Sequence, residues 1–489
     1  MSEFCLLPAH VQLQRLRTGV LSASELLAMH LDRVARHNPR LNALCVLDAE
    51  RATARAKAAD AALARGTPLG PLHGLPMTVK ESFDIPGLPT TWGLARLRDH
   101  VPDQPAWAVQ RLQDAGAVIF GKSNVPASLA DWQTFNPVYG TTNNPWDLAR
   151  GPGGSSGGSA AALAAGLTAL ELGSDIGASI RNPAHYCGVW GHKPTWGLLS
   201  LQGQQLPGTL CADTLDLAVI GPLARSAHDL VLAVDVLTQP LRCFSPRGWQ
   251  PAAWRDAGRA PAQMRVAVLA DDPVAPVDQE VQGAIAELVR FLRDAGVQVN
   301  EDARPVDSRV AWETYVWLLR GATGAKLDDE GYAQAERARD AADAAAPAAN
   351  DYARWVWHAS TQSHRDWVRH DQQRQRLRMQ WEAFFETHDL LVCPVATTPA
   401  FKHQQQGMRW ERMLDVNGVP QASTDQLFWA GYPGVVGLPA TAVPLGLSAQ
   451  GLPIGVQLIG PALGDPVCLR MARWLEDGYR SFVAPPGWD

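Results

Sequence analysis

The chain has 489 residues, of which 46% are hydrophobic and 19% charged, and its formal net charge at pH 7 is −6. This is the composition of an ordinary soluble globular protein, without a run of about 18 apolar residues for a membrane span or a dense Lys/Arg stripe for nucleic acid. The first residues lack a basic leader and a long apolar stretch, so we expect a cytoplasmic protein without a secretory signal.

The first 65 residues are expected to form peripheral helices. Residues 22–37 place apolar side chains at helical spacing behind Ser22 and Ser24, which are residue types that often cap a helix. Residues 51–66 are rich in alanine and end at Gly66, a residue type that often terminates a helix. The pattern changes after this point, so we place these helices outside the central part of the fold.

Short apolar runs separated by glycines and prolines follow the helical segment. Each run is about as long as a buried strand, and the clearest lie at residues 75–80, 116–122, 264–270 and 388–395. Helical patterns alternate with them, as at residues 278–296. This alternation predicts an α/β fold in which a largely buried mixed sheet is flanked by α-helices on both faces.

The stretch from about residue 305 to 370 is rich in tryptophan. Core packing and the wall of an apolar or aromatic pocket both explain such residues, and the sequence leaves both interpretations open. The tryptophans concerned are Trp312, Trp317, Trp355, Trp357 and Trp367. An alanine-rich helix is also expected over residues 333–350, ending near Pro347.

We expect neither a metal nor a cofactor. His358, His364 and His370 are spaced so that they do not share one helix face, and no acidic partner motif accompanies them. A solvated helix surface explains them better. The seven cysteines are scattered without a CxxC pair, which indicates reduced thiols rather than a zinc site or a disulfide framework.

Two glycine-rich elements and one lysine carry the chemistry. Residues 151–159 read GPGGSSGGS and lead into the small-residue segment AAALAAGL. Three interpretations of this element are open. It could be a phosphate loop, although the lysine expected after the last glycine is missing, or a G-x-S-x-G nucleophile elbow, which residues 153–157 match. The third interpretation is a plain tight turn. A second element, GSDIGASIRNP at residues 173–183, and Lys80 in LPMTVKESFDIPG distinguish among these interpretations.

Together these segments resemble the amidase signature family over nearly the whole chain. The matching segments are GPLHGLPMTVKESFDIPG, AGAVIFGKSNVP, YGTTNNPWD, GPGGSSGGSAAALAAG, GSDIGASIRNPA, CGVWGHKPTWG, IGPLARS, and GLPATAVPLG through GLPIGVQLIGP. The resemblance implies one large α/β domain over residues 1–489. Its expected parts are N-terminal helices (1–65), a catalytic core (66–235), a variable substrate-pocket region (236–430) and the C-terminal part of the core (431–489).

The resemblance also implies a Ser–Ser–Lys triad. Ser179 of the G-[GA]-S-I-R element is the nucleophile, Ser155 is the relay serine after a cis peptide bond to Gly154, and Lys80 is the base. The 24 positions between Ser155 and Ser179 are the usual spacing, which favours Ser155 over Ser156. Lys80 can accept a proton from Ser155 only if burial lowers its pKa from about 10.4, and Ser155 then takes the proton of Ser179.

The loop before the nucleophile is expected to form the oxyanion hole, in which each backbone donor is worth about 10²–10³ in rate. The expected donors are the N–H groups of Ile176, Gly177, Ala178 and Ser179. Two positions depart from the family pattern, because Ala178 stands where glycine is commoner and Glu81 stands where aspartate is common after the base. We expect Ala178 to narrow the loop without removing a donor, and Asp175 to brace it through an ion pair with Arg181.

Leu129 and Trp132 are similar in position to side chains that lie beside the acyl group in related enzymes, although core packing explains both equally well. These two side chains favour a substrate with an apolar or aromatic body. The segment after HDLLVCPVATTPAF lacks the usual pattern of the amidotransferase subunit, so the resemblance favours a stand-alone amidase. We expect it to cleave an amide, anilide or carbamate, and esters as a side activity. An amidotransferase subunit that releases ammonia to a partner, and a non-catalytic receptor with an amidase fold, are the alternatives. A homodimer is left open.

Overall fold

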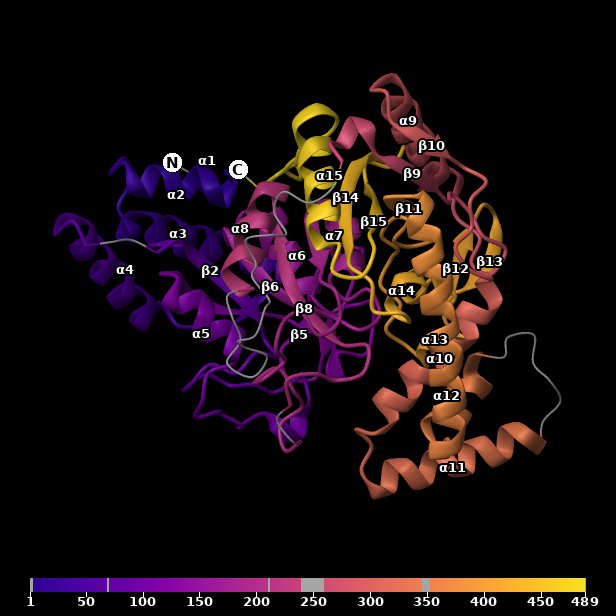
Figure 1. Ribbon diagram of the computed structural model, residues 1–489. Helices are drawn as coiled ribbons and strands as arrows, with labels where there is room; N and C mark the ends of the chain where they lie inside the picture. Colours follow the sequence, from indigo (N-terminus) through magenta and orange to yellow (C-terminus); the bar gives the residue numbers. More distant parts are fainter. Residues whose placement is uncertain (1–2, 68–69, 210–211, 239–258, 345–351, 489) are drawn as a thin grey trace, which may run out of the picture.

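The computed structural model describes residues 3–67, 70–209, 212–238, 259–344 and 352–488. Within these residues eleven strands form one mixed sheet, in the order β1-β3-β2-β6-β8-β7-β14-β15-β11-β9-β10. Figure 1 labels several of these strands. The strands of this sheet are β1 (Leu44–Leu47), β2 (Pro76–Lys80), β3 (Val118–Ser123), β6 (Leu170–Asp175), β7 (Trp190–Lys193), β8 (Val219–Ala224), β9 (Arg265–Val268), β10 (Gln298–Asn300), β11 (Leu390–Pro394), β14 (Ala440–Leu447) and β15 (Pro453–Ile459).

The parallel pairing of β2 with β6 positions the site. Their register joins Thr78 to Glu171 and Val79 to Leu172, so both strands run toward the same edge of the sheet. Beyond β6 the sheet is antiparallel through β8, β7, β14 and β15. Lys80 ends β2 and Asp175 ends β6. The carboxyl ends of parallel strands meet at one edge, where ligands commonly bind in α/β proteins.

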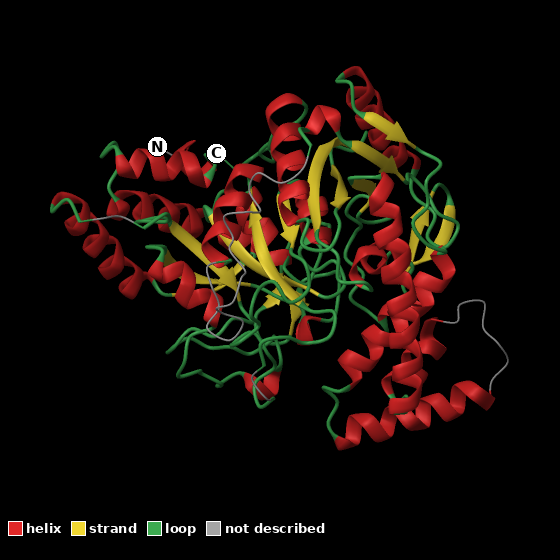
Figure 2. Cartoon of the chain, in the orientation of Figure 1, coloured by secondary structure: helices red, strands yellow, loops and turns green. Residues whose placement is uncertain are grey.

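Helices cover both faces of this sheet (Figure 2). The helices are α1 (Glu3–Leu6), α2 (Ala9–Arg17), α3 (Ala23–Leu41), α4 (Ala49–Ala64), α5 (Trp107–Asp114), α6 (Gly157–Ala164), α7 (Arg181–Cys187), α8 (Ala227–Leu237), α9 (Gln279–Asp294), α10 (Ser308–Gly324), α11 (Asp329–Ala344), α12 (Tyr352–Ser360), α13 (His364–Thr387), α14 (Leu427–Gly434) and α15 (Asp465–Gly478). All eight residues of α6 are buried, because a helix made of small residues can pack closely on every side.

Helices α12 and α13 both pack on α10, and α10 also contacts α14. Short 3₁₀ helices and two-stranded hairpins complete the described structure. They are η1 (Ala95–Leu97), η2 (Ala127–Leu129), η4 (Pro261–Gln263), η5 (Arg409–Glu411), β4 (Phe135–Asn136) with β5 (Gly140–Thr141), and β12 (Met413–Val416) with β13 (Val419–Ala422). Residues 236–430 also supply β9, β10 and β11 to the main sheet, so this segment belongs to the same body as the rest.

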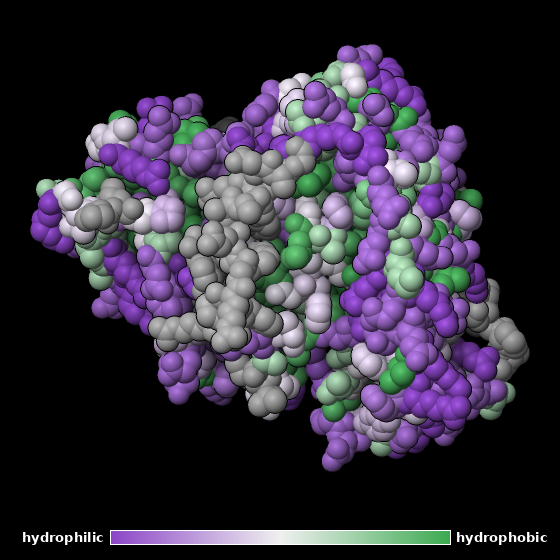
Figure 3. Space-filling view, in the orientation of Figure 1, coloured by the Kyte–Doolittle hydropathy of each residue, from purple (hydrophilic) through white to green (hydrophobic). Residues whose placement is uncertain are grey.

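One large hydrophobic core runs through most of the described residues, beside a small second cluster of Tyr186, Ala396 and Ala400. Buried residues from Ala9 to Trp488 belong to one contiguous cluster, as expected for one large domain. On the face shown in Figure 3, hydrophilic residues cover the outer helices on both sides, and more hydrophobic residues gather in the band between them.

Most elements lie where the sequence predicted them. Strands β2, β3, β9 and β11 fall on the four apolar runs, and α9 occupies the helical pattern at residues 278–296. Helix α3 begins at a capping box, in which the Ser22 side chain accepts the Glu25 N–H and the Glu25 carboxylate accepts the Ser22 N–H. The predicted alanine-rich helix is α11, while its predicted end at Pro347 lies outside the described residues.

The N-terminal segment differs from the prediction in one respect. Residues 44–47 are not helical but form β1, which pairs antiparallel with β3 at one end of the sheet. A four-residue apolar run between two helices has no distinctive period of its own. Its conformation depends on hydrogen bonds to a strand more than 70 residues away in the chain, of which Leu44 pairing with Ser123 is an example.

Candidate active site

Lys80 lies fully buried at the end of β2 and faces two serine hydroxyls. Its Nζ is 2.6 Å from Ser155 Oγ and 3.0 Å from Ser174 Oγ. Burial lowers the pKa of Lys80 to about 7, because desolvation penalises the ammonium form. The charge of Asp175 acts in the opposite direction and that of Lys326 adds to the lowering. A lysine whose pKa lies near 7 is partly neutral at neutral pH and can then accept a proton.

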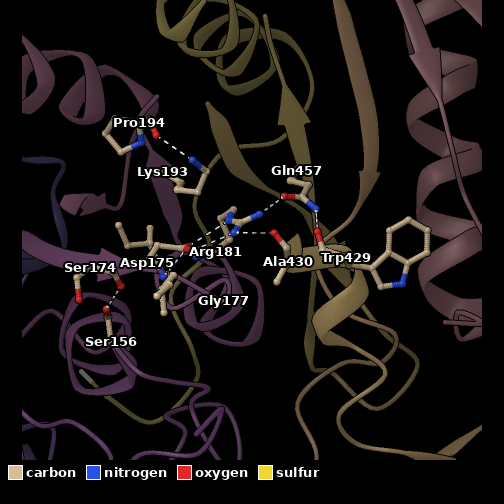
Figure 4. Close-up of polar contacts among 12 residues, drawn as sticks. Ser156, Ser174, Asp175, Gly177, Arg181, Lys193, Pro194, Trp429, Ala430 and Gln457 are labelled. Atoms are coloured by element: carbon tan, nitrogen blue, oxygen red, sulfur yellow. Dashed lines mark hydrogen bonds and ion pairs between the residues drawn. The ribbon is translucent and has the colours of Figure 1, made fainter. Parts of the chain in front are cut away.

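Ser155 stands in the glycine-rich loop that leads into α6. The peptide bond between Gly154 and Ser155 is cis, as the resemblance implied. A Cβ at Gly154 would overlap the carbonyl oxygen of Asp131, so this position requires glycine. The neighbouring hydroxyl of Ser156 is directed to the Ser174 carbonyl at 3.4 Å (Figure 4). Of the two adjacent serines, the structure therefore brings Ser155 to Lys80.

Side chains from other elements hold the loop that follows β6 by its carbonyl groups. Trp132 Nε1 donates to the Gly177 oxygen at 2.7 Å, and the Tyr315 hydroxyl of α10 donates to the Ile176 oxygen at 3.0 Å. A Cβ at Gly177 would lie 3.1 Å from that same hydroxyl oxygen. Hydrogen bonds to its carbonyl oxygens thus hold the loop, and the donors are side chains that are distant from the loop in the sequence.

The N–H groups of the same loop are unengaged. Within the described residues, the backbone N–H groups of positions 176–179 donate no hydrogen bond, whereas the Ile180 N–H donates to the Asp175 carboxylate at 3.1 Å. Ala178 adopts φ +61°, a left-handed conformation that favours glycine and explains why glycine suits this position. Consecutive free N–H groups in such a turn form a concave site for negative charge.

Arg181 and Asp175 form the ion pair expected from the sequence, and Figure 4 shows how it extends across the molecule. The guanidinium contacts both carboxylate oxygens of Asp175, at 2.9 Å and 3.1 Å. It also donates to Gln457 Oε1 on β15 at 2.7 Å and to the Ala430 carbonyl of α14 at 3.2 Å. Burial acts to raise the pKa of Asp175, but Arg181 and the hydrogen bonds lower it in sum. Asp175 is thus a stable carboxylate.

Ser155 and Ser179 both line a cavity of about 410 Å³. No hydrogen bond joins their two hydroxyls within the described part of the chain, and the Ser179 backbone oxygen accepts the Ser156 N–H at 3.0 Å. In a protein without substrate such catalytic contacts are often long and shorten only in the complex. Leu129 and Trp132, the two predicted pocket residues, also line this cavity.

Several cavity residues were not predicted. Of the tryptophans between residues 305 and 370, Trp357 lines the cavity, and Trp92 and Trp410 line it from outside that stretch. Trp92 is held by Glu81, whose carboxylate accepts the N–H groups of Thr91 and Trp92 at 2.5 Å and 3.0 Å. The acid after the base therefore shapes the cavity wall. The sequence signal was the acid at position 81 directly after Lys80, because its carboxylate needs hydrogen-bond donors and Trp92 supplies one of them.

No group of three or more His, Cys, Asp and Glu side chains in the described part of the chain is arranged to hold a metal ion. No helix among these residues has both the length and the apolar character needed to cross a bilayer.

Comparison with known proteins agrees with this geometry. A family model described as Amidase matches residues 25–469. The chain is 32% identical over 496 residues to a glutamyl-tRNA(Gln) amidotransferase subunit of Synechococcus sp., an alignment that covers 97% of this chain and 96% of the relative. It is also 32% identical over 481 residues to indoleacetamide hydrolase of Bradyrhizobium diazoefficiens, covering 94% of this chain and 84% of that protein.

Among solved structures, 6-aminohexanoate cyclic dimer hydrolase complexed with its substrate aligns over 99% of both chains, with a TM-score of 0.79 and 27% identity. The ordered motifs of the sequence, the fold and these matches lead to one assignment. The chain belongs to the amidase family.

Proposed function

We propose that the protein is a stand-alone amidase that hydrolyses a C–N bond of an amide, anilide or carbamate through an acyl-enzyme on Ser179. Neutral Lys80 accepts the proton of Ser155 while Ser155 accepts that of Ser179, and Ser179 Oγ bonds to the carbonyl carbon. The proton then returns through Ser155 to the leaving nitrogen as the C–N bond breaks. Water, deprotonated by the same route, cleaves the ester to Ser179 and releases the acid.

The contact between Lys80 Nζ and Ser155 Oγ at 2.6 Å carries this proposal. A buried lysine with a pKa of about 7 is a suitable base at neutral pH, since a base is most effective when its pKa lies near the working pH. Core packing alone does not explain a buried serine in contact with such a lysine, because it favours apolar side chains at fully buried positions.

The loop at residues 176–179 supports the same chemistry. Negative charge develops on the carbonyl oxygen as Ser179 attacks, and the unengaged N–H groups of this loop are suited to receive it. Because the carbonyls of Ile176 and Gly177 are already bonded to Tyr315 and Trp132, the loop needs little reorganisation when the charge appears. We propose Ile176, Gly177, Ala178 and Ser179 as the oxyanion hole.

The cavity wall favours a substrate with an apolar or aromatic body. Leu129, Trp132 and Trp92 line the cavity next to the serines and provide flat apolar surfaces. The name of one relative, indoleacetamide hydrolase, likewise denotes an amide with an aromatic ring. Aryl and arylalkyl amides and carbamates are therefore the substrates to test first.

An amidotransferase subunit is the second candidate, because several relatives at about 32% identity carry that name. The purified chain alone separates the two functions. We expect it to hydrolyse 4-nitroanilides, arylacetamides and aryl carbamates without added partner, with formation of the acid and free amine or ammonia. No turnover of the whole panel by the chain alone, and turnover of glutamine once partner proteins are supplied, would contradict the proposal.

A pH profile tests the role of Lys80. Since the base must be neutral, kcat/KM for an anilide is expected to rise about tenfold per pH unit below a pKa near 7 and to level off above it. Lys193 is the matched control, because burial also lowers its pKa to about 7 although its Nζ donates to the Pro194 carbonyl instead of a serine. Lys193→Met is expected to keep the inflection. Its disappearance in that variant would assign it to Lys193.

A further inference from the structure

The wall of the cavity that Ser155 and Ser179 line includes positively charged side chains. We define the cationic wall as Arg320 at the end of α10, Lys326 after α10 and Arg409 in η5, all of which line the cavity. None of the three forms an ion pair with a carboxylate among the described residues. Taking a cation partly out of water without a counterion is unfavourable, so this wall is suited to bind a negatively charged group.

Arg320 is the most deeply buried member, with 4% of its surface exposed. Its guanidinium lies 5.4 Å above the Tyr352 ring and donates to the Tyr352 hydroxyl. Its buried Nε has no hydrogen-bond partner among the described residues. A buried guanidinium N–H normally finds an acceptor, so a donor is left over for a ligand in the cavity.

Arg409 lies close enough to Arg320 for the two charges to affect each other. Burial, together with the positive charge of Arg320, lowers the pKa of Arg409 to about 10, although the charge of Asp131 acts in the opposite direction. Within the described structure Arg409 donates to the Ala130 carbonyl, a neutral acceptor. Two neighbouring arginines without a carboxylate repel each other, and an anion between or beside them would relieve the repulsion.

Lys326 adds positive charge nearer to the base. Its Nζ lies 4.9 Å above the ring of Trp92, whose buried indole N–H has no hydrogen-bond partner in the described part of the chain. The charge of Lys326 also contributes to the lowered pKa of Lys80. The cationic wall and the serines therefore face the same space.

The carboxylates of the cavity do not balance this charge. Asp131 and Asp175 are the acidic residues among the described residues that line it. Asp131 pairs with Arg412 at 2.5 Å, and Asp175 pairs with Arg181. Each acid thus has its own arginine, and the cationic wall is left in excess.

We infer that the substrate is an amide that carries a carboxylate, which binds the cationic wall while the aromatic residues contact its apolar body. This inference rests on the proposed function and narrows it to N-acyl or amide compounds with a free acid group. A substrate whose carboxylate accepts charge-assisted hydrogen bonds is expected to bind about 10- to 100-fold more tightly than one with a neutral group there, because the neutral group leaves the donors unpaired.

Two matched substrate pairs test the inference on either side of the scissile bond. One pair is succinyl 4-nitroanilide against butyryl 4-nitroanilide, and the other is 4-acetamidobenzoate against acetanilide. We expect the charged member of at least one pair to have the higher kcat/KM. The ratio of charged to neutral kcat/KM is expected to fall about 10- to 100-fold in Lys326→Met, Arg409→Met or Arg320→Met.

Exposed cations on α4 provide the control. Lys57→Met and Arg55→Met change the net charge equally but lie outside the cavity lining, and they are expected to keep the ratio. If Arg320→Met does not fold because it loses Tyr352, the other two variants still decide. Equal kcat/KM for both members of both pairs, or an unchanged ratio in all folded variants, would overturn the inference.

Binding measurements separate this inference from the proposed function. Calorimetric titration of the Ser179→Ala protein with the same four compounds requires no turnover. Tighter binding of a charged member, dependent on the cationic wall, together with no hydrolysis by the wild type would refute the amidase but retain the carboxylate site. Hydrolysis of the neutral members without any binding preference would retain the amidase and refute the carboxylate site.

Discussion

Replacement of Ser179 by alanine is expected to lower amide turnover by about 10⁴- to 10⁶-fold, the loss seen when the nucleophile of a serine hydrolase is removed. Without Oγ no acyl-enzyme forms, and the residual rate comes from the oxyanion loop and binding alone. Steady-state kinetics on an anilide gives the size of the loss. Intact-protein mass spectrometry during turnover of an activated ester is expected to show an acyl adduct on the wild type and none on the variant.

The variant is expected to fold normally. The Ser179 hydroxyl makes no hydrogen bond within the described residues, so its removal leaves no buried group unpaired, and the thermal unfolding midpoint is expected to stay close to that of the wild type. Ser156→Ala is the matched control, because Ser156 contacts the Ser174 carbonyl instead of Lys80. An adduct that persists on Ser179→Ala, or a larger loss in Ser156→Ala, would contradict the assigned nucleophile.

Replacement of Lys80 by methionine is expected to lower anilide turnover by about 10²- to 10⁴-fold, the usual contribution of a general acid–base group. A 4-nitrophenyl ester with the same acyl group is expected to lose less. The reason is that an amine must be protonated to leave, whereas a nitrophenolate leaves without a proton. The ratio of anilide to ester kcat therefore measures the acid role of the lysine separately from its contribution to nucleophile activation.

Lys193→Met serves as the control for removal of a buried lysine. This variant removes a second buried lysine whose pKa burial lowers to about 7. It is expected to leave the ratio of anilide to ester kcat unchanged. Equal losses on both substrates in Lys80→Met would assign Lys80 to nucleophile activation or to structure and would contradict its role in amine departure.

The features that the sequence predicted well are those that local backbone geometry imposes. Gly154 must be glycine because any side chain would meet Asp131, and position 178 favours glycine because its φ is positive. Such requirements leave a readable pattern in a short window of sequence. The buried apolar runs of β2 and β3 are of the same kind. The positions of the three triad residues follow from these motifs, while their catalytic roles stay predictions until the variants are measured.

The features that the sequence did not predict depend on contacts between distant segments. Tyr315 holds the Ile176 carbonyl although 139 positions separate them, and no periodicity in α10 distinguishes this tyrosine from a core residue. Lys326 and Trp92 likewise meet only in the folded chain. The sequence indicated a tryptophan-rich pocket region, but it gave no sign that arginines and a lysine would share that wall.

The hydrogen bonds of Arg181 have a consequence for protein synthesis. This arginine connects the loop of the nucleophile to Ala430 and Gln457, which are 249 and 276 positions later in the chain. Ribosomes build chains from the N-terminus at about 5–20 residues per second, so Ser179 emerges long before its supports exist. A nascent chain that stops before β15 is therefore expected to be inactive even though it contains all three triad residues, and hydrolytic competence should appear only as synthesis nears its end.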